Sequence, residues 1–151
     1  MYIIPYNDLI FSSLSIGGAI HCKIVDLGNA CFEGEQFTLN IQTRQYRCPE
    51  TLLQMNYSFS ADVWSAACVI YEMITGKYLF QPDGDTESLR DLDQLSRFEE
   101  VVGRIPKEMV EESPRKKELF KHDVRSGVEN LMNRNHCVTN EPFDLICCQN
   151  D

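Results

Sequence analysis

The sequence is short of basic residues and contains no long apolar run. Its 151 residues include 14 lysines and arginines against 23 aspartates and glutamates, which gives a formal net charge of −9. This acid excess argues against binding to the phosphate backbone of DNA or RNA and favours basic partners. No apolar stretch has the length needed to cross a bilayer. A composition of 43% hydrophobic and 25% charged residues is typical of a single globular domain with its own core.

The seven cysteines do not form the pairs that metal or redox sites use. No Cys-x-x-Cys pair is present, so the sequence gives no support for a zinc ribbon or a thioredoxin-type site. Cys147 and Cys148 are adjacent, which leaves two interpretations open: a metal or redox pair, or two residues of an unpatterned tail. We expect reduced thiols in a cytosolic or nuclear protein. The apolar stretch from Met1 to Ile20 lacks basic residues, so we do not expect a signal peptide.

Residues 60–75 carry the clearest pattern in the chain. Ser60 can cap the start of a helix and Gly76 can end it, and nearly every position between them is apolar. A helix that is apolar on nearly every face is typical of the centre of a core. The sequence therefore predicts a buried central helix over 60–75. Any part of it that lacks neighbours should promote association between molecules.

Shorter elements are predicted on both sides of this helix. A strand is expected at 23–25, a long ordered loop over 30–47, and an amphipathic helix over 91–102. Pro49 opens a short helix, because proline is tolerated in the first helical turn. Two later prolines delimit shorter helical pieces, Pro106 and Pro114.

The periodic part of the sequence has definable limits. Helical and strand patterns occupy residues 22–125, which we interpret as one partial domain. Residues 1–21 are a divergent leader, and residues 126–151 form a polar, cysteine-containing tail that we expect to be poorly ordered.

Three short motifs follow the predicted strand in a fixed order. Asp26-Leu27-Gly28 comes directly after the strand, Pro49-Glu50 begins 23 residues later, and Asp62-Val63-Trp64-Ser65 opens the long helix. Each motif alone is a common turn or helix start. In this order they resemble the activation segment and the C-terminal lobe of a protein kinase.

The residues between these motifs narrow the resemblance. The run Ile41-Gln42-Thr43-Arg44-Gln45-Tyr46-Arg47, together with Asp26-Leu27-Gly28-Asn29-Ala30-Cys31, is similar to the SR-protein kinases of the CMGC group. The similarity covers about residues 22–110. It implies a mainly α fold, namely a truncated C-terminal lobe whose complete family fold is α+β. It also implies ATP and Mg²⁺ as cofactors and arginine–serine-rich proteins as substrates.

The resemblance assigns roles to individual residues. Asp26 would be the carboxylate that holds Mg²⁺ against the nucleotide phosphates. The shelf that receives the substrate would be a run of four residues, Thr43, Arg44, Gln45 and Tyr46. Support from within the lobe would come from three residues, Arg47, Glu50 and Asp62.

Two of these supporting roles carry open questions. Asp62 would accept hydrogen bonds from the catalytic loop, or else it satisfies the first turn of its own helix. Glu50 would pair with an arginine from a late helix, but the polar tail shows no such arginine motif.

Several parts of the phosphoryl-transfer machinery are missing from the sequence. It contains no G-x-G-x-x-G loop, no V-A-I-K-like lysine and no H-R-D-x-x-x-x-N loop. Asp8 lies 18 residues before Asp26, a plausible spacing for a catalytic aspartate. However, Ile10 and Ser13 stand where a lysine and an asparagine belong, so we interpret Asp8 as a coincidence. We therefore expect the chain alone to be inactive and to bind ATP weakly.

Negative charge is concentrated in residues 81–112, which contain ten acidic and four basic side chains. SR-protein kinases dock basic substrates in an acidic groove, and Asp93 and Glu100 fall on groove positions. Lys77 occupies a third groove position. A basic residue there reverses the expected charge and would weaken docking. The alternative is an ordinary solvated acidic face.

Three functional hypotheses follow from these observations. The first is a partial serine/threonine kinase domain, inactive alone. The second is a catalytically dead acidic module that docks basic arginine–serine-rich peptides, and the third is a truncated gene product without function. The resemblance also implies a cytoplasmic and nuclear location, and from the composition we expect no direct contact with nucleic acid or membrane.

Overall fold

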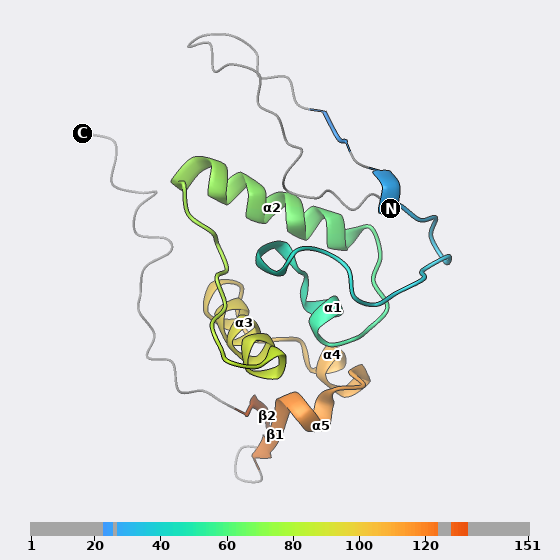
Figure 1. Ribbon diagram of the computed structural model, residues 1–151. Helices are drawn as coiled ribbons and strands as arrows, with labels where there is room; N and C mark the ends of the chain where they lie inside the picture. Colours follow the sequence, from blue (N-terminus) through green and yellow to red (C-terminus); the bar gives the residue numbers. More distant parts are fainter. Residues whose placement is uncertain (1–22, 26, 124–127, 133–151) are drawn as a thin grey trace, which may run out of the picture.

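The computed structural model describes residues 23–25, 27–123 and 128–132. Helices dominate this part of the chain, and one two-stranded antiparallel sheet follows them (Figure 1). The elements in chain order are η2 (Leu27–Asn29), η3 (Arg44–Tyr46), α1 (Pro49–Leu52), α2 (Ser60–Thr75), α3 (Glu87–Val101), α4 (Lys107–Glu112), α5 (Lys116–Leu119), β1 (Phe120–Asp123) and β2 (Val128–Leu131). In Figure 1, α2 and the β1–β2 hairpin lie at opposite ends, with α3 between them.

Helix α2 has the predicted bounds but is not buried on all faces. It ends where Gly76 adopts φ 70°, a left-handed conformation that glycine reaches without a steric penalty. Ser60 is its first residue, not its cap, and Phe59 precedes it. The buried residues of α2 are Ala61, Ser65 and Cys68. The prediction of a buried central helix is therefore wrong for this structure, because α2 packs on its neighbours along one side only.

Helix α3 confirms the predicted amphipathic helix and begins four residues earlier than expected. Thr86 caps it, since the Thr86 hydroxyl accepts a hydrogen bond from the Leu89 amide at 3.3 Å. Gly103, just beyond the helix, has φ 97°. The short helix at Pro49 and the two helical pieces after Pro106 and Pro114 are also present, as α1, α4 and α5.

The main core joins α2 to α3 through three aromatic rings. Trp64 stacks on Phe80 with ring centroids 5.7 Å apart. Phe98 of α3 meets both rings edge-on, at 4.8 Å from Trp64 and 4.6 Å from Phe80. Leucines of α1, α3, α5 and β2 extend this cluster: Leu52, Leu53, Leu92, Leu95, Leu119 and Leu131. Burial of these side chains is the main source of stability.

The two ends of the described chain differ from the predictions. Residues 23–25 are not a strand. Beyond α5, β1 pairs antiparallel with β2, with Phe120 opposite Leu131. Leu131 is buried in the main core. This hairpin extends beyond residue 125, the predicted end of the partial domain. The prediction missed it because four-residue strands with so few apolar residues are too short to give a periodic signal. Within the described residues, no helix is long and apolar enough to span a membrane.

Candidate functional site

The segment before α1 is organised around the side chain of Gln42. Gln42 has φ 68°, which turns its side chain toward α2. Its Nε2 donates to the carbonyl of Ala61 at 2.7 Å and to the hydroxyl of Ser65 at 2.9 Å. Its Oε1 accepts from the amide of Cys48 at 2.9 Å. Sequence reasoning gave Gln42 no role. The available signal was its place in the run of residues 41–47 that resembles SR-protein kinases.

The η3 turn is held between α2 and α3. The Ser65 hydroxyl donates to the carbonyl of Tyr46 at 2.9 Å, and the Tyr46 hydroxyl donates to a carboxylate oxygen of Glu72 at 2.7 Å. From the other side, Nε2 of Gln94 donates to the carbonyl of Arg44 at 2.7 Å. These bonds fix the turn in place. Residues 43–46, predicted to form a substrate shelf, therefore sit on a rigid support.

The four predicted shelf residues differ in how accessible they are. Thr43 is exposed and Gln45 is half-buried, so both can meet a ligand. Tyr46 is buried, and the guanidinium of Arg44 forms ion pairs with Glu87 and Asp91. The side chains of Arg44 and Tyr46 thus position the turn. Direct substrate contact by the shelf stays a prediction that rests on Thr43 and Gln45.

Arg47 lies inside the loop that precedes α1. Its Nη2 donates to the carbonyl of Gln42 at 3.2 Å, a contact that closes this loop. Burial, and then the neighbouring Arg44 charge, lower the pKa of Arg47 from its ordinary value. The predicted supporting role of Arg47 is compatible with this placement.

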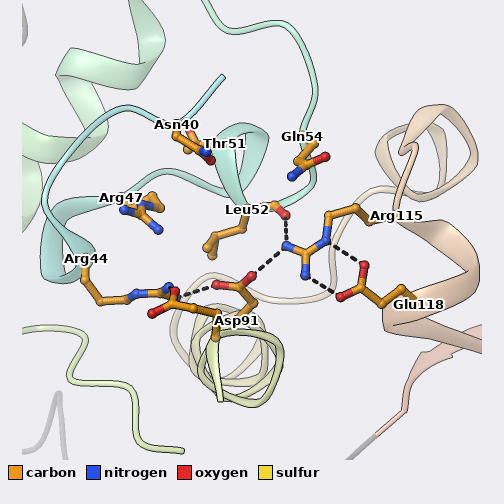
Figure 2. Close-up of a pocket in the computed structure, with 10 residues that line it drawn as sticks. Asn40, Arg44, Arg47, Thr51, Leu52, Gln54, Asp91, Arg115 and Glu118 are labelled. Carbon is orange, nitrogen blue, oxygen red and sulfur yellow. Dashed lines mark hydrogen bonds and ion pairs between the residues drawn. The ribbon is translucent and has the colours of Figure 1, made fainter. Parts of the chain in front are cut away.

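A cavity of about 380 Å³ opens beside η3 and α1. Figure 2 shows Asp91 between the guanidinium groups of Arg44 and Arg115. Arg115 Nη1 lies 2.6 Å from Asp91 Oδ2 and donates to the carbonyl of Leu52 at 2.8 Å. Three arginines and three carboxylates line the cavity, so their formal charges balance. Several of these groups already form ion pairs with one another.

The acidic positions predicted to form a docking groove do not share one environment. Asp93 is buried, and its Oδ2 accepts from Arg97 Nε at 2.7 Å and from the Asp83 amide at 2.8 Å. Glu100 is exposed near the end of α3, and Lys77 is exposed after α2. The Asp93 carboxylate is thus engaged by α3 and by the segment before it, and contact between Asp93 and substrate stays a prediction. Glu100 remains available.

Of three other predicted residues, the structure describes only Asp62. Asp26 and Asp8 lie outside the described residues, so the structure says nothing of either. Asp62 is half-buried in the first turn of α2, and the sequence contains no motif of the catalytic loop that was predicted to contact it. Within the described part of the chain, no group of three or more histidine, cysteine, aspartate or glutamate residues could hold a metal ion.

Glu50 and Cys48 lie at the start of α1. Among the described residues, no ion pair joins Glu50 to an arginine, and its pairing with a late-helix arginine stays untested. Burial raises the pKa of the Cys48 thiol to about 11, and that of Cys68 in α2 to about 12. Both thiols are thus protonated at neutral pH and poorly nucleophilic.

Comparisons with known proteins converge on one family. A model of the protein kinase domain matches residues 4–141. Serine/threonine-protein kinase SKY1 of Saccharomyces cerevisiae is 47% identical over 87 residues, which cover 58% of this chain and 12% of the relative. SRSF protein kinase 3 of Homo sapiens is 47% identical over 87 residues, which cover 58% and 15%. A putative serine/threonine-protein kinase of Acanthamoeba polyphaga mimivirus is 45% identical over 114 residues, which cover 74% and 21%. The chain therefore spans only a small part of these relatives' length.

Proposed function

We propose that this chain, which belongs to the protein kinase domain family, is the activation segment and part of the helical C-terminal lobe of an SR-protein-kinase-like serine/threonine kinase. The supporting observation is the η3 turn, which lies in the run of residues 41–47 that resembles SR-protein kinases and is bonded to α2 through Ser65 and to α3 through Gln94. A rigid, partly exposed turn beside a short Pro-Glu helix is suited to receive an extended peptide.

In the intact family this lobe works with ATP and Mg²⁺ to phosphorylate serines in arginine–serine-rich proteins. Asp26 is the residue of this chain that we assign to the metal. Phosphoryl transfer also needs a lysine on the phosphates and a group that orients the attacking hydroxyl. The sequence offers neither, so the chain alone should not catalyse the reaction. We further propose that the protein acts in the cytoplasm and nucleus.

The test of inactivity is a transfer assay with labelled ATP, Mg²⁺ and an arginine–serine peptide. We expect no phosphate on the peptide above the background of a protein-free reaction. Clear turnover that Asp26→Ala abolishes would contradict the proposal, because it would show a working metal site on this chain.

Docking of a basic peptide is the second candidate function, and exposed Glu100 within the acidic segment favours it. A surface of one sign of charge attracts a cationic peptide, more strongly at low salt. Peptide affinity measured by fluorescence anisotropy should fall as salt rises. Because Asp93 is buried, only Glu100 is a suitable position for a charge reversal.

Glu100→Lys should weaken binding by about threefold at low salt, the scale of one exposed charge pair. The matched control is Glu108→Lys, which reverses an exposed acid on α4. Absence of binding, or equal loss in both variants, would exclude a docking surface at the end of α3.

A further inference from the structure

We propose that Arg115 is a positioning residue that fixes α1 and, through Asp91, the η3 turn, which forms most of the predicted substrate shelf. Arg115 lies between α4 and α5, more than 60 residues beyond α1, and no sequence motif points to it. This inference deepens the proposed function, and it rests on that proposal only in treating residues 43–46 as a substrate shelf. The geometry of Arg115 itself stands independently.

The first step is the end of α1, a helix of only four residues. The last carbonyls of a helix have no partner within the helix, and a single turn is unstable alone. Arg115 Nη1 donates to the carbonyl of Leu52 at 2.8 Å, and the Ser113 hydroxyl donates to the carbonyl of Leu53 at 3.0 Å. The 113–115 segment therefore caps α1 from a distant part of the chain.

The second step is the carboxylate of Asp91, which is 6% exposed. Its Oδ2 lies 2.6 Å from Arg115 Nη1, and its Oδ1 pairs with Arg44 (Figure 2). One buried carboxylate thus joins two guanidinium groups. Because Arg44 belongs to η3, the position of the turn depends on Asp91, and the position of Asp91 depends on Arg115.

The third step is what holds Arg115 in turn. Its Nε and Nη2 donate to the two carboxylate oxygens of Glu118, at 3.0 and 2.6 Å. This bidentate contact leaves Nη1 directed at Asp91 and Leu52. A planar guanidinium can donate to Glu118 through two nitrogens and to Asp91 and Leu52 through the third. A lysine ammonium cannot reproduce this arrangement of donors. The site therefore requires arginine.

The experiment compares Arg115→Met and Arg115→Lys with Lys117→Met, a neighbouring exposed lysine that serves as the control. Amide hydrogen exchange is followed in three places: at Leu53 for α1, at Tyr46 and Arg47 for η3, and across residues 66–72 for α2. Affinity for an arginine–serine peptide is measured on the same samples, at temperatures where each variant is folded.

In Arg115→Met, exchange at α1 and η3 should accelerate by about tenfold or more, the scale of one unsatisfied buried polar group. Exchange in α2 should change little, and Lys117→Met should match the original chain. Arg115→Lys should show intermediate exchange, because it retains the charge but loses the fork. Peptide affinity should fall in the same order as local protection is lost.

Equal acceleration in α2 and η3, or none at α1 and η3, would overturn the proposal. The first outcome would make Arg115 a residue of general stability, and the second would make it dispensable. If Arg115→Met does not fold, the same comparison is decided by Arg115→Lys. If the original chain binds no peptide, the docking function fails, while the exchange pattern still decides the role of Arg115.

Discussion

The two long helices of this protein reverse the usual relation between polarity and burial. Helix α2 is mostly apolar, yet Val63 is 68% exposed and Ile74 is 69% exposed. Helix α3 carries many charged residues, yet Asp91 is 6% exposed and Gln94 is not exposed at all. Hydropathy therefore does not decide which of the two helices lies deeper in the described structure.

The difference comes from the partners that other segments supply. On α3, two buried polar side chains meet partners from other segments: Asp91 meets Arg115 and Arg44, and Gln94 donates to the Arg44 carbonyl. Buried polar groups cost little when they are paired in this way. On α2, one side packs on η3 and the aromatic cluster, while Val63 and Ile74 face away from it.

Phe98→Ala should have the largest effect, because it breaks the contact between the two helices. Phe98 is buried against Trp64 and Phe80, and truncation of a buried phenylalanine costs about 3–5 kcal/mol. Urea unfolding followed by tryptophan fluorescence would measure the loss. Val102→Ala, on exposed apolar surface beside α3, should change the free energy of unfolding by less than about 0.5 kcal/mol. Similar losses in both variants would mean that the aromatic cluster is not the core.

Local sequence signals predicted most of the helices but not their depth. Pro49 and Gly76 mark helix ends through backbone chemistry that needs no tertiary contact, and both positions were predicted well. The depth of α2 was predicted wrongly, because a helix that is apolar all round does not specify which neighbours are present. The hairpin pairing of residues 120–123 with 128–131 was also missed.

The candidate site was predictable as a segment but not as a set of contacts. The resemblance singled out residues 43–47 as a segment, and their role as a substrate shelf stays a prediction. The partners of Arg44 come from α3, and Arg115 comes from a segment without a motif. Asp93 was assigned to substrate through the resemblance to SR-protein kinases, and only the tertiary structure shows that Arg97 and the Asp83 amide donate to its carboxylate.

Asp93→Asn should have the next largest effect on the free energy of unfolding. It tests whether the buried polar groups of α3 depend on their partners. The change removes the charge from a buried carboxylate that accepts from Arg97 and Asp83, with an expected cost of about 1–3 kcal/mol. Glu100→Gln removes an exposed charge from the same helix and should cost about 0.5 kcal/mol or less. Both are measured by urea unfolding. If Asp93→Asn were as mild as Glu100→Gln, the burial of charge on α3 would not depend on those partners.

A smaller effect on stability is expected from the ionisation of Glu118 at acid pH. Hydrogen bonds from Arg115 and then Ser88 lower the pKa of Glu118 from 4.5 to about 2 in the folded chain. A carboxyl with a lowered folded pKa stabilises the fold above its unfolded pKa and loses that contribution as pH falls from about 4.5 to about 2. Because Glu118 is about half-exposed, the contribution is about 0.5–1 kcal/mol.

Glu118→Gln should therefore reduce the acid-induced loss of stability in that pH window and leave the rest of the profile unchanged. Thermal unfolding at a series of pH values would measure it. Glu112→Gln, an exposed acid of α4, is the control. An unchanged slope between pH 4.5 and 2 in Glu118→Gln would mean that the contact with Arg115 is absent in solution.

The smallest effect on stability, and the sharpest on association, is expected from the exposed side of α2. Val63→Lys and Val102→Lys place the same charge on valines of nearly equal exposure, 68% and 65%, but only Val63 lies on α2. Each should change the free energy of unfolding by less than about 0.5 kcal/mol, since neither site is buried. Val63 lies on the same exposed apolar side of α2 as Ile70 and Ile74, and Val102 does not. Only Val63→Lys should therefore lower self-association, measured by light scattering at increasing protein concentration. An equal decrease in both variants would assign association to net charge, and a large loss of stability in Val63→Lys would show that this side of α2 is covered after all.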